Sequence, residues 1–151
     1  AEEAALYDKA AELFRKAISL DPSNAAPAYN YLGYMWAEQN SHLDEAEDAM
    51  KRALQADPSN GAYLDSMAWV QYRQGKFDQA LESAQSAIKN LPKEDPVVYE
   101  HLGDIYAKMK RGGDALAAWQ KAHALDPANK EIAQKIESQK TQVSANTTPR
   151  P

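Results

Sequence analysis

Cysteine is absent from the 151 residues, so the chain has no disulfides and no thiolate metal ligands. Basic residues are the minority, 17 lysines and arginines against 22 aspartates and glutamates. The net charge of -5 gives no basic footprint for nucleic acid or an anionic membrane. No apolar run approaches the roughly 18 residues of a membrane span, and no signal peptide is recognisable. We therefore expect no nucleic-acid partner and no direct membrane insertion.

The sequence does contain an internal repeat. "DPSN" occurs at residues 21–24 and again at 57–60, and "DPAN" follows at 126–129. Four kinds of landmark recur every 34 to 36 residues. They are a small residue (Gly33, Ala68, Gly103), a first alanine (Ala10, Ala46, Ala80, Ala115), a second alanine (Ala17, Ala53, Ala87, Ala122) and a proline (Pro22, Pro58, Pro92, Pro127). A period of this length indicates a repeat architecture.

Each unit is predicted to contain two helices. In the middle unit the first helix runs near 62–74 and the second near 79–90, with Gly75 in the break between them. Because a residue that precedes proline is pushed out of the helical region, the recurring prolines mark helix boundaries. "DPSN" is therefore a turn between units, and the small residues allow the two helices of a unit to approach closely.

The order of aromatic, Leu-Gly, aromatic, alanine, alanine and Asp-Pro resembles the tetratricopeptide repeat family, bacterial type. The resemblance implies an all-α fold, a right-handed superhelical solenoid of helix-turn-helix repeats with a C-terminal capping helix. One domain would cover residues 1–140. The predicted segments are a lone second helix at 1–22, three repeats at about 26–129, a capping helix at about 130–140 and a disordered tail at 141–151.

Two features depart from the family pattern. Gln71 stands where an aromatic residue is usual, and "KRGGDA" replaces the usual Gly-x-aromatic turn, which predicts a looser third turn.

The lone second helix at 1–22 lacks a first helix to pack against. We expect further repeats upstream of it in the full-length protein. The alternative is self-association through the uncovered face.

No pattern in the chain supports catalysis. His101 and Asp104 form an i, i+3 pair that a metal would bind weakly, and such a pair is more often a polar helix surface. "RGGD" lacks the Lys and Ser/Thr of a phosphate loop. The acids of "LDEAED" suit the first turn of a helix. We expect no enzyme activity, no cofactor and no metal site.

The family resemblance implies a concave groove lined by the first helices, which binds peptides or partner segments. Residues spaced by four share a helix face, and the groove positions are Asn30, Tyr34, Glu38, Asp65, Trp69, Arg73, Glu100, Asp104 and Lys108. Acids outnumber bases there, so we expect a partner segment with basic and apolar residues. Trp69 is predicted to be an exposed binding hot spot. The alternative is that it packs on the adjacent first helix, against Tyr34 or His101, and stabilises the stack.

Two functions remain open from the sequence. One is a non-catalytic scaffold that binds a partner peptide or protein segment. The other is a structural assembly module on a larger polymer or envelope complex, because the unit phrases are similar to bacterial repeat proteins that include kinesin-light-chain-like proteins and envelope lipoproteins. The compartment, bacterial cytoplasm or periplasm and envelope, stays open.

One subgroup of the family grips the C-terminal carboxylate of chaperones with lysine, arginine and asparagine side chains. The matching positions here are Asn30, Tyr34, Ser66, Val97 and His101. Because they include no lysine or arginine to pair with a carboxylate, we predict no binding to acidic chaperone tails.

Overall fold

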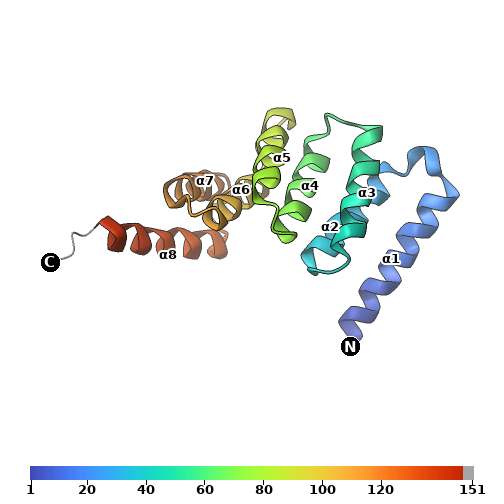
Figure 1. The fold of residues 1–151 in the computed structure, drawn as a ribbon, viewed down its shortest axis with the longest axis horizontal. Coiled ribbons are helices and arrows are strands. Elements are labelled where there is room, and N and C mark those ends of the chain that lie inside the picture. The colour runs from blue at the N-terminus through green and yellow to red at the C-terminus, as the bar shows by residue number, and fades with distance from the viewer. Residues whose placement is uncertain (148–151) are drawn as a thin grey trace. The chain divides into compact units, whose positions relative to one another are not determined.

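The computed structural model describes residues 1–147, and helix is the regular structure throughout that part of the chain, without a strand. The helices are α1 (Glu2–Leu20), the 3-10 turn η1 (Pro22–Asn24), α2 (Ala26–Glu38), α3 (Leu43–Ala56), α4 (Gly61–Arg73), α5 (Phe77–Asn90), α6 (Pro96–Lys108), α7 (Gly112–Leu125) and α8 (Lys130–Thr147). Figure 1 shows them in order along the chain. The expected all-α repeat fold is confirmed. The first helices of the repeats are α2, α4 and α6, and the second helices are α1, α3, α5 and α7.

The helices group into two compact units, Ala1–Asn90 and Leu91–Pro151. The division falls in the connection "LPKED" at residues 91–95, which lacks the Asp-Pro-x-Asn sequence of the other three turns between repeats. Unit 1 contains α1 to α5 and unit 2 contains α6 to α8.

The Asp-Pro-x-Asn turns are held by their own side chains. Asn60 Nδ2 donates to Asp57 Oδ2 at 3.1 Å, and Asn60 Oδ1 accepts the backbone N–H of Tyr63 at 3.1 Å. Asn129 likewise accepts the N–H of Ile132 at 3.2 Å. Asn60 and Asn129 therefore cap the following helices, because each side chain satisfies an N–H that has no partner inside the helix. Asn24 instead bonds Asp21 at 2.9 Å and does not cap α2.

Small residues at the helix crossings allow close packing, as predicted. A Cβ built on Gly33 of α2 would lie 2.8 Å from Met50 Sδ of α3, which is closer than real Cβ atoms approach. In unit 2 a Cβ on Gly103 of α6 would overlap the Trp119 ring of α7. Ala46 and Ala53 of α3 are fully buried. The landmark residues thus form the contact between the two helices of a repeat.

We expected the turn between α6 and α7 to be looser than the other turns. The structure contradicts this expectation, because the turn has the same geometry as the turn between α4 and α5. Arg111 N–H donates to Tyr106 O at 2.9 Å, and Lys76 N–H donates to Gln71 O at the same distance in the α4–α5 turn. Lys110, with φ +63°, adopts the left-handed conformation that Gly75, with φ +78°, adopts in that turn. A non-glycine residue accepts this strained conformation, so the turn keeps its geometry without the usual glycine.

The C-terminal helix is longer than predicted. α8 runs to Thr147, so residues 141–147 are helical where we expected a disordered tail, and residues 148–151 lie outside the described part. The cause is an inward stripe that continues at helical spacing. Ile132 and Ile136 are buried, and Val143 is half-buried. A Cβ on Gly112 would meet Gln139 and lie 3.7 Å from Val143, so this stretch packs on the start of α7.

Candidate functional site

In unit 1 the predicted groove positions lie on α2 and α4, which pack against each other. We call their side chains the first-helix face of unit 1. It comprises Asn30, Tyr34 and Glu38 on α2 and Asp65, Trp69 and Arg73 on α4. Glu38 is exposed, while Asn30, Tyr34 and Arg73 are half-buried. These four residues are the accessible part of the face.

Trp69 is not the exposed anchor that we predicted. Its side chain is only 7% exposed and belongs to the hydrophobic core cluster of unit 1, against which Tyr34 packs. The indole stacks on the Tyr72 ring with centroids 4.7 Å apart, and the Arg73 guanidinium lies 5.1 Å from the indole centroid. Asp65 is buried as well. Neighbours on its own helix, Tyr72 and Arg73, cover the ring. Of the two neighbours named in the packing alternative, Tyr34 packs on the same core cluster.

Two polar atoms on this face have unmet hydrogen-bonding capacity. Asn30 Oδ1 and Arg73 Nε are buried and form no hydrogen bond within the described part of the chain. A buried donor or acceptor without a partner typically costs about 1–3 kcal/mol. The face therefore contains a buried acceptor and a buried donor that no hydrogen bond satisfies within the described residues.

In unit 2 the predicted groove acids are already bound from within the chain. Lys135 Nζ of α8 lies 2.9 Å from Glu100 Oε2 and 2.9 Å from Asp104 Oδ1. Trp119 Nε1 also donates to Asp104 Oδ1, at 3.1 Å. Lys108, in the last turn of α6, is exposed. The capping helix therefore occupies the part of α6 that we had assigned to a partner.

The electrostatics of this contact follow from burial and pairing. Burial raises the pKa of Asp104 above its usual range, and the Lys135 ammonium opposes part of that rise. Burial acts to lower the pKa of Lys135, but its hydrogen bond to Glu100 and the charge of Asp104 outweigh burial, so this pKa is raised. Lys135 thus stays charged and holds α8 on α6.

From the sequence, His101 and Asp104 were considered as a pair of side chains that would bind a metal ion weakly. His101 is 5% exposed, and no group of three or more metal-ligating side chains occurs anywhere in the described residues.

None of the described helices is long and apolar enough to cross a membrane.

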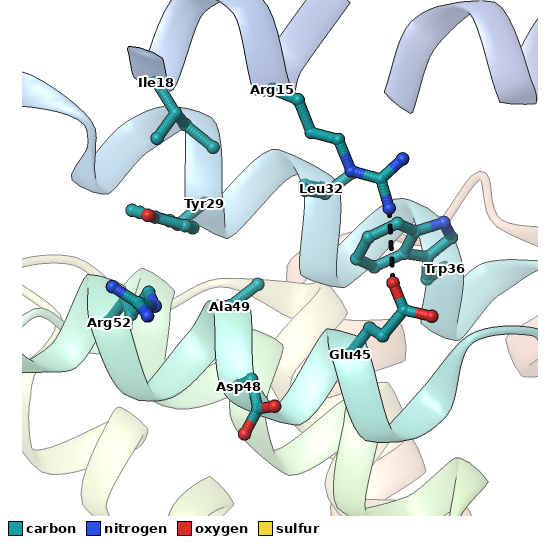
Figure 2. A pocket seen from close by; sticks show the side chains of 9 residues that line it. All are labelled: Arg15, Ile18, Tyr29, Leu32, Trp36, Glu45, Asp48, Ala49 and Arg52. Carbon is teal, nitrogen blue, oxygen red and sulfur yellow. Dashed lines mark hydrogen bonds and ion pairs between the residues drawn. The ribbon is translucent and has the colours of Figure 1, made fainter. Parts of the chain in front are cut away.

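A pocket of about 250 Å³ opens between α1, α2 and α3 of unit 1, shown in Figure 2. It was not predicted from the sequence, because its residues come from three helices. Its lining is Arg15, Ile18, Tyr29, Leu32, Trp36, Glu45, Asp48, Ala49 and Arg52. The volume is smaller than the 300–1,000 Å³ typical of small-molecule sites, so it matches an amino-acid side chain better than a cofactor.

Two arginines stand over aromatic rings at the pocket rim. Arg15 lies 5.4 Å from the Trp36 centroid and forms an ion pair with Glu45 at 3.2 Å. Arg52 lies 5.7 Å from the Tyr29 centroid. The Arg15–Glu45 pair crosses above Trp36 in Figure 2. Both partners of that pair are more than half exposed, so the pair holds the rim weakly.

The next repeat has polar residues where this pocket has apolar ones. Gln71 of α4 takes the repeat position of Trp36, and Ser83 of α5 takes that of Ala49. Ser83 Oγ donates to Gln71 Oε1 at 2.7 Å. The departure from the family pattern at Gln71 is therefore matched by a polar partner on the second helix.

The comparisons with known proteins agree with this fold. The tetratricopeptide repeat family model matches residues 1–61 and 66–130. A TPR repeat-containing protein of Pseudomonas aeruginosa is 37% identical over 90 residues, which are 60% of this chain and 15% of that protein. The matched segment is thus a small part of the relative's length.

Solved structures resemble the chain in fold. Pseudomonas aeruginosa pilF matches with a TM-score of 0.81 and 22% identity, over 95% of this chain and 64% of that one. MamA matches with a TM-score of 0.77 and 19% identity, over 95% and 82%. The first TPR domain of Spaghetti (RPAP3), bound to the HSP90 peptide SRMEEVD, matches with a TM-score of 0.71 and 20% identity, over 79% and 93%.

Proposed function

Because the chain belongs to the tetratricopeptide repeat family, we propose that it is a non-catalytic scaffold whose first-helix face in unit 1 binds an extended segment of a protein partner. A similar fold binds a peptide in the Spaghetti (RPAP3) structure. The observation that carries the proposal is the pair of unmet polar atoms, Asn30 Oδ1 and Arg73 Nε. The corresponding α6 face of unit 2 is a poorer candidate, because Lys135 already binds its acids.

The backbone of an extended peptide has the hydrogen-bonding groups that can pair with Asn30 Oδ1 and Arg73 Nε. Its backbone N–H groups can donate to Asn30 Oδ1, and its carbonyl groups can accept from Arg73 Nε, once small side-chain rotations open the two atoms. The half-buried Tyr34 lies four residues after Asn30 on the same side of α2. Tyrosine gives a large contact area at low entropic cost and is enriched among binding hot spots.

The contact of Lys135 with Glu100 and Asp104 supports a basic partner. In that contact, two carboxylates of a first helix bind the lysine ammonium of a neighbouring helix. In unit 1 the exposed carboxylate of Glu38 is available for the same role. We propose that the partner segment carries a lysine or arginine beside an apolar residue.

Selection of a phage-displayed random peptide library on the chain, followed by calorimetry on the enriched peptides, tests this function. Enriched peptides should combine basic and apolar residues, and Tyr34→Ala and Arg73→Ala should each weaken binding by about tenfold or more. Arg52→Ala, at the rim of the α1–α2–α3 pocket, is the matched control and should bind like the parent. Loss of binding in Arg52→Ala alone would instead make that pocket the site.

A second function, assembly with other repeat units, is supported by a separate observation. Leu6, Leu13 and Leu20 of α1 are 71%, 58% and 74% exposed. Soluble proteins seldom leave an apolar stripe of this kind uncovered unless a partner binds it.

A further inference from the structure

The α1–α2–α3 pocket has an apolar interior between charged ends. Leu32 and Ala49 are buried at its base, and the half-buried Ile18 belongs to its α1 wall. At one end Arg15 of α1 reaches Glu45 of α3, with Nη2 3.2 Å from Oε2 (Figure 2). Because this ion pair crosses from one second helix to the other, a chain that ran along the pocket would have to break it. The pocket is therefore better suited to a single side chain that enters from outside.

The other end of the pocket has a cation without an ion pair. Arg52 of α3 is exposed, and its guanidinium lies 5.7 Å from the ring centroid of Tyr29. It pairs with no carboxylate of the described residues. In Figure 2 the Asp48 side chain extends from the opposite side of α3, away from α1. The planar guanidinium of an arginine matches a carboxylate through two parallel hydrogen bonds. Arg52 is thus available to a carboxylate of a partner.

A lysine or arginine of a partner does not suit this pocket. Such a cation would be attracted to the face of an aromatic ring. The Trp36 ring, however, already has the Arg15 guanidinium 5.4 Å from its centroid. The Tyr29 ring has that of Arg52 at 5.7 Å. Glu45 is occupied by its ion pair with Arg15. An added cation would therefore meet like charge at both ends, and the complementary ligand combines an apolar body with a negative charge.

The ring at the closed end of the pocket is held by the turn that follows α2. Residues 39–42 join α2 to α3, whereas the shorter segments 74–76 and 109–111 join the other two helix pairs. His42 in this turn has φ +51°, and its imidazole stacks on the Trp36 ring with centroids 5.3 Å apart. Trp36 is therefore fixed before a ligand arrives. A pocket that is formed in advance loses less entropy when it binds.

The comparable places elsewhere in the chain differ in chemistry. Where α3, α4 and α5 of unit 1 meet, Leu64 stands in place of Tyr29. Ser86 stands there in place of Arg52. In unit 2 a pocket of about 240 Å³ between α7 and α8 has no arginine in its lining. The repeat fold itself therefore does not require two arginines and two aromatic rings around such a pocket.

We propose that the α1–α2–α3 pocket binds an acidic segment of a protein partner. An apolar side chain of that segment occupies the space over Leu32 and Ala49, and a glutamate or aspartate beside it pairs with Arg52. The volume of about 250 Å³ suits one such side chain. The pocket shares no residue with the first-helix face of unit 1, to which the proposed function assigns a basic segment. The chain thus has separate sites for partner segments of opposite charge.

Nuclear magnetic resonance with short peptides tests the proposal, because each of the three tryptophans lies in different surroundings. Trp36 lines the pocket, Trp69 is in the core of unit 1 and Trp119 is in unit 2. The isotopically labelled full chain is titrated with the peptide acetyl-Gly-Ser-Glu-Leu-Glu-Ser-Gly-amide. The indole N–H signal of Trp36 should shift saturably, while those of the other two tryptophans stay in place.

Three control peptides separate the charge from the apolar contact. Replacement of both glutamates by glutamine should weaken binding about fivefold or more, and replacement by lysine should weaken it further. Replacement of the leucine by glycine should also weaken it about fivefold or more. Equal binding of the glutamate and lysine peptides, or a shift at Trp69 without one at Trp36, would overturn the proposal.

A pair of variants on α3 tests the role of Arg52. Arg52→Gln should weaken the glutamate peptide about fivefold and remove its advantage over the glutamine peptide. Its circular dichroism should stay that of the parent, because Arg52 is exposed. Lys51→Gln removes an exposed charge from the adjacent position, so it is the matched control and should bind like the parent. Equal losses in the two variants would show that only the overall charge matters, and the proposal would be wrong.

Discussion

Lys135 of α8 and Asp104 of α6 make a two-point contact, with Nζ 2.9 Å from Oδ1 and 3.1 Å from Oδ2. The contact fastens the capping helix to the last repeat. Glu100 joins it through the same ammonium.

Removing that ammonium should destabilise the chain. Lys135→Ala leaves two poorly exposed carboxylates without a counter-charge, and we expect a loss of about 2 kcal/mol in the free energy of unfolding. Urea denaturation measures it. Lys140→Ala is the control, since Lys140 pairs with an exposed Glu137 at 3.7 Å, and it should change stability by less than about 0.5 kcal/mol. Equal effects of the two substitutions would contradict a holding role for Lys135.

Trp69 should behave as a core residue. Trp69→Ala removes a buried ring together with its stacking on Tyr72, and we expect a loss of about 3 kcal/mol or more in stability. Thermal and urea unfolding measure the loss. The control is Tyr31→Ala on α2, because that ring is 60% exposed and its removal should cost less than about 1 kcal/mol. A Trp69→Ala variant as stable as the parent would show that the ring is not part of the core.

Adding a methyl group at Gly103, where α6 crosses α7, should destabilise the chain, and Gly113 of α7 is the control position. In Gly103→Ala the added methyl overlaps the Trp119 ring, and the resulting overpacking should cost about 1–3 kcal/mol. Gly113→Ala places its methyl in open space within the first turn of α7. It should be neutral or stabilise by up to about 1 kcal/mol, because alanine favours helix over glycine. Chemical denaturation of both variants would detect the opposite signs.

Glu47 should make stability depend on acid pH. Hydrogen bonds from Lys76 and Gln74, each 2.8 Å long, and the nearby Lys51 hold the pKa of Glu47 at about 2, below its usual 4.5. A lowered folded-state pKa contributes stability above about pH 4.5, and this contribution is lost as the pH falls toward 2.

Glu47→Gln tests this dependence. The variant should be less stable than the parent by about 1–2 kcal/mol at pH 7, and the difference should vanish near pH 2. Denaturation at a series of pH values measures it. Glu45→Gln breaks an exposed ion pair and is the control, which should change stability at pH 7 by less than about 0.5 kcal/mol. A Glu47→Gln deficit that persists unchanged at pH 2 would rule out this explanation.

Acidic chaperone tails should not bind. Of the positions that match the carboxylate-gripping subgroup, Ser66 and His101 are buried and Val97 is an exposed aliphatic residue, so none offers a cation to a carboxylate. Calorimetry with the peptide SRMEEVD should give no micromolar binding. A peptide of the same composition with a C-terminal amide is the control, and specific binding of the free acid would refute the prediction.

The repeat fold could be predicted from the sequence because its information is local and recurs. The alanines, prolines and small residues set the helix boundaries and crossings in each unit, and the structure confirms the packing at Gly33 and Gly103. The end of α8 was missed because polar residues of 141–147 suggested disorder. The half-buried Val143 continues the helical stripe there, and a single residue in seven is a weak sequence signal.

The groove was harder to predict, because side-chain position depends on neighbours that the repeat spacing does not specify. Trp69 is at a groove position by spacing, yet Tyr72 and Arg73 of the same helix cover it. Glu100 and Asp104 were predicted to be open, and Lys135, more than thirty residues later, binds them. Long-range pairing of this kind follows from the fold and has no signature in the local sequence.

The hydrogen bond between Ser83 and Gln71 limits how the repeats can be exchanged or duplicated. A chimera that moved only α2 into the place of α4 would set Trp36 against Ser83, and the hydroxyl would lose its 2.7 Å acceptor. The reverse exchange would set Gln71 against Ala49. Recombination within the gene should therefore succeed when its breakpoints fall in the Asp-Pro-x-Asn turns, so that both helices of a repeat travel together, and fail when they fall between a first helix and its second.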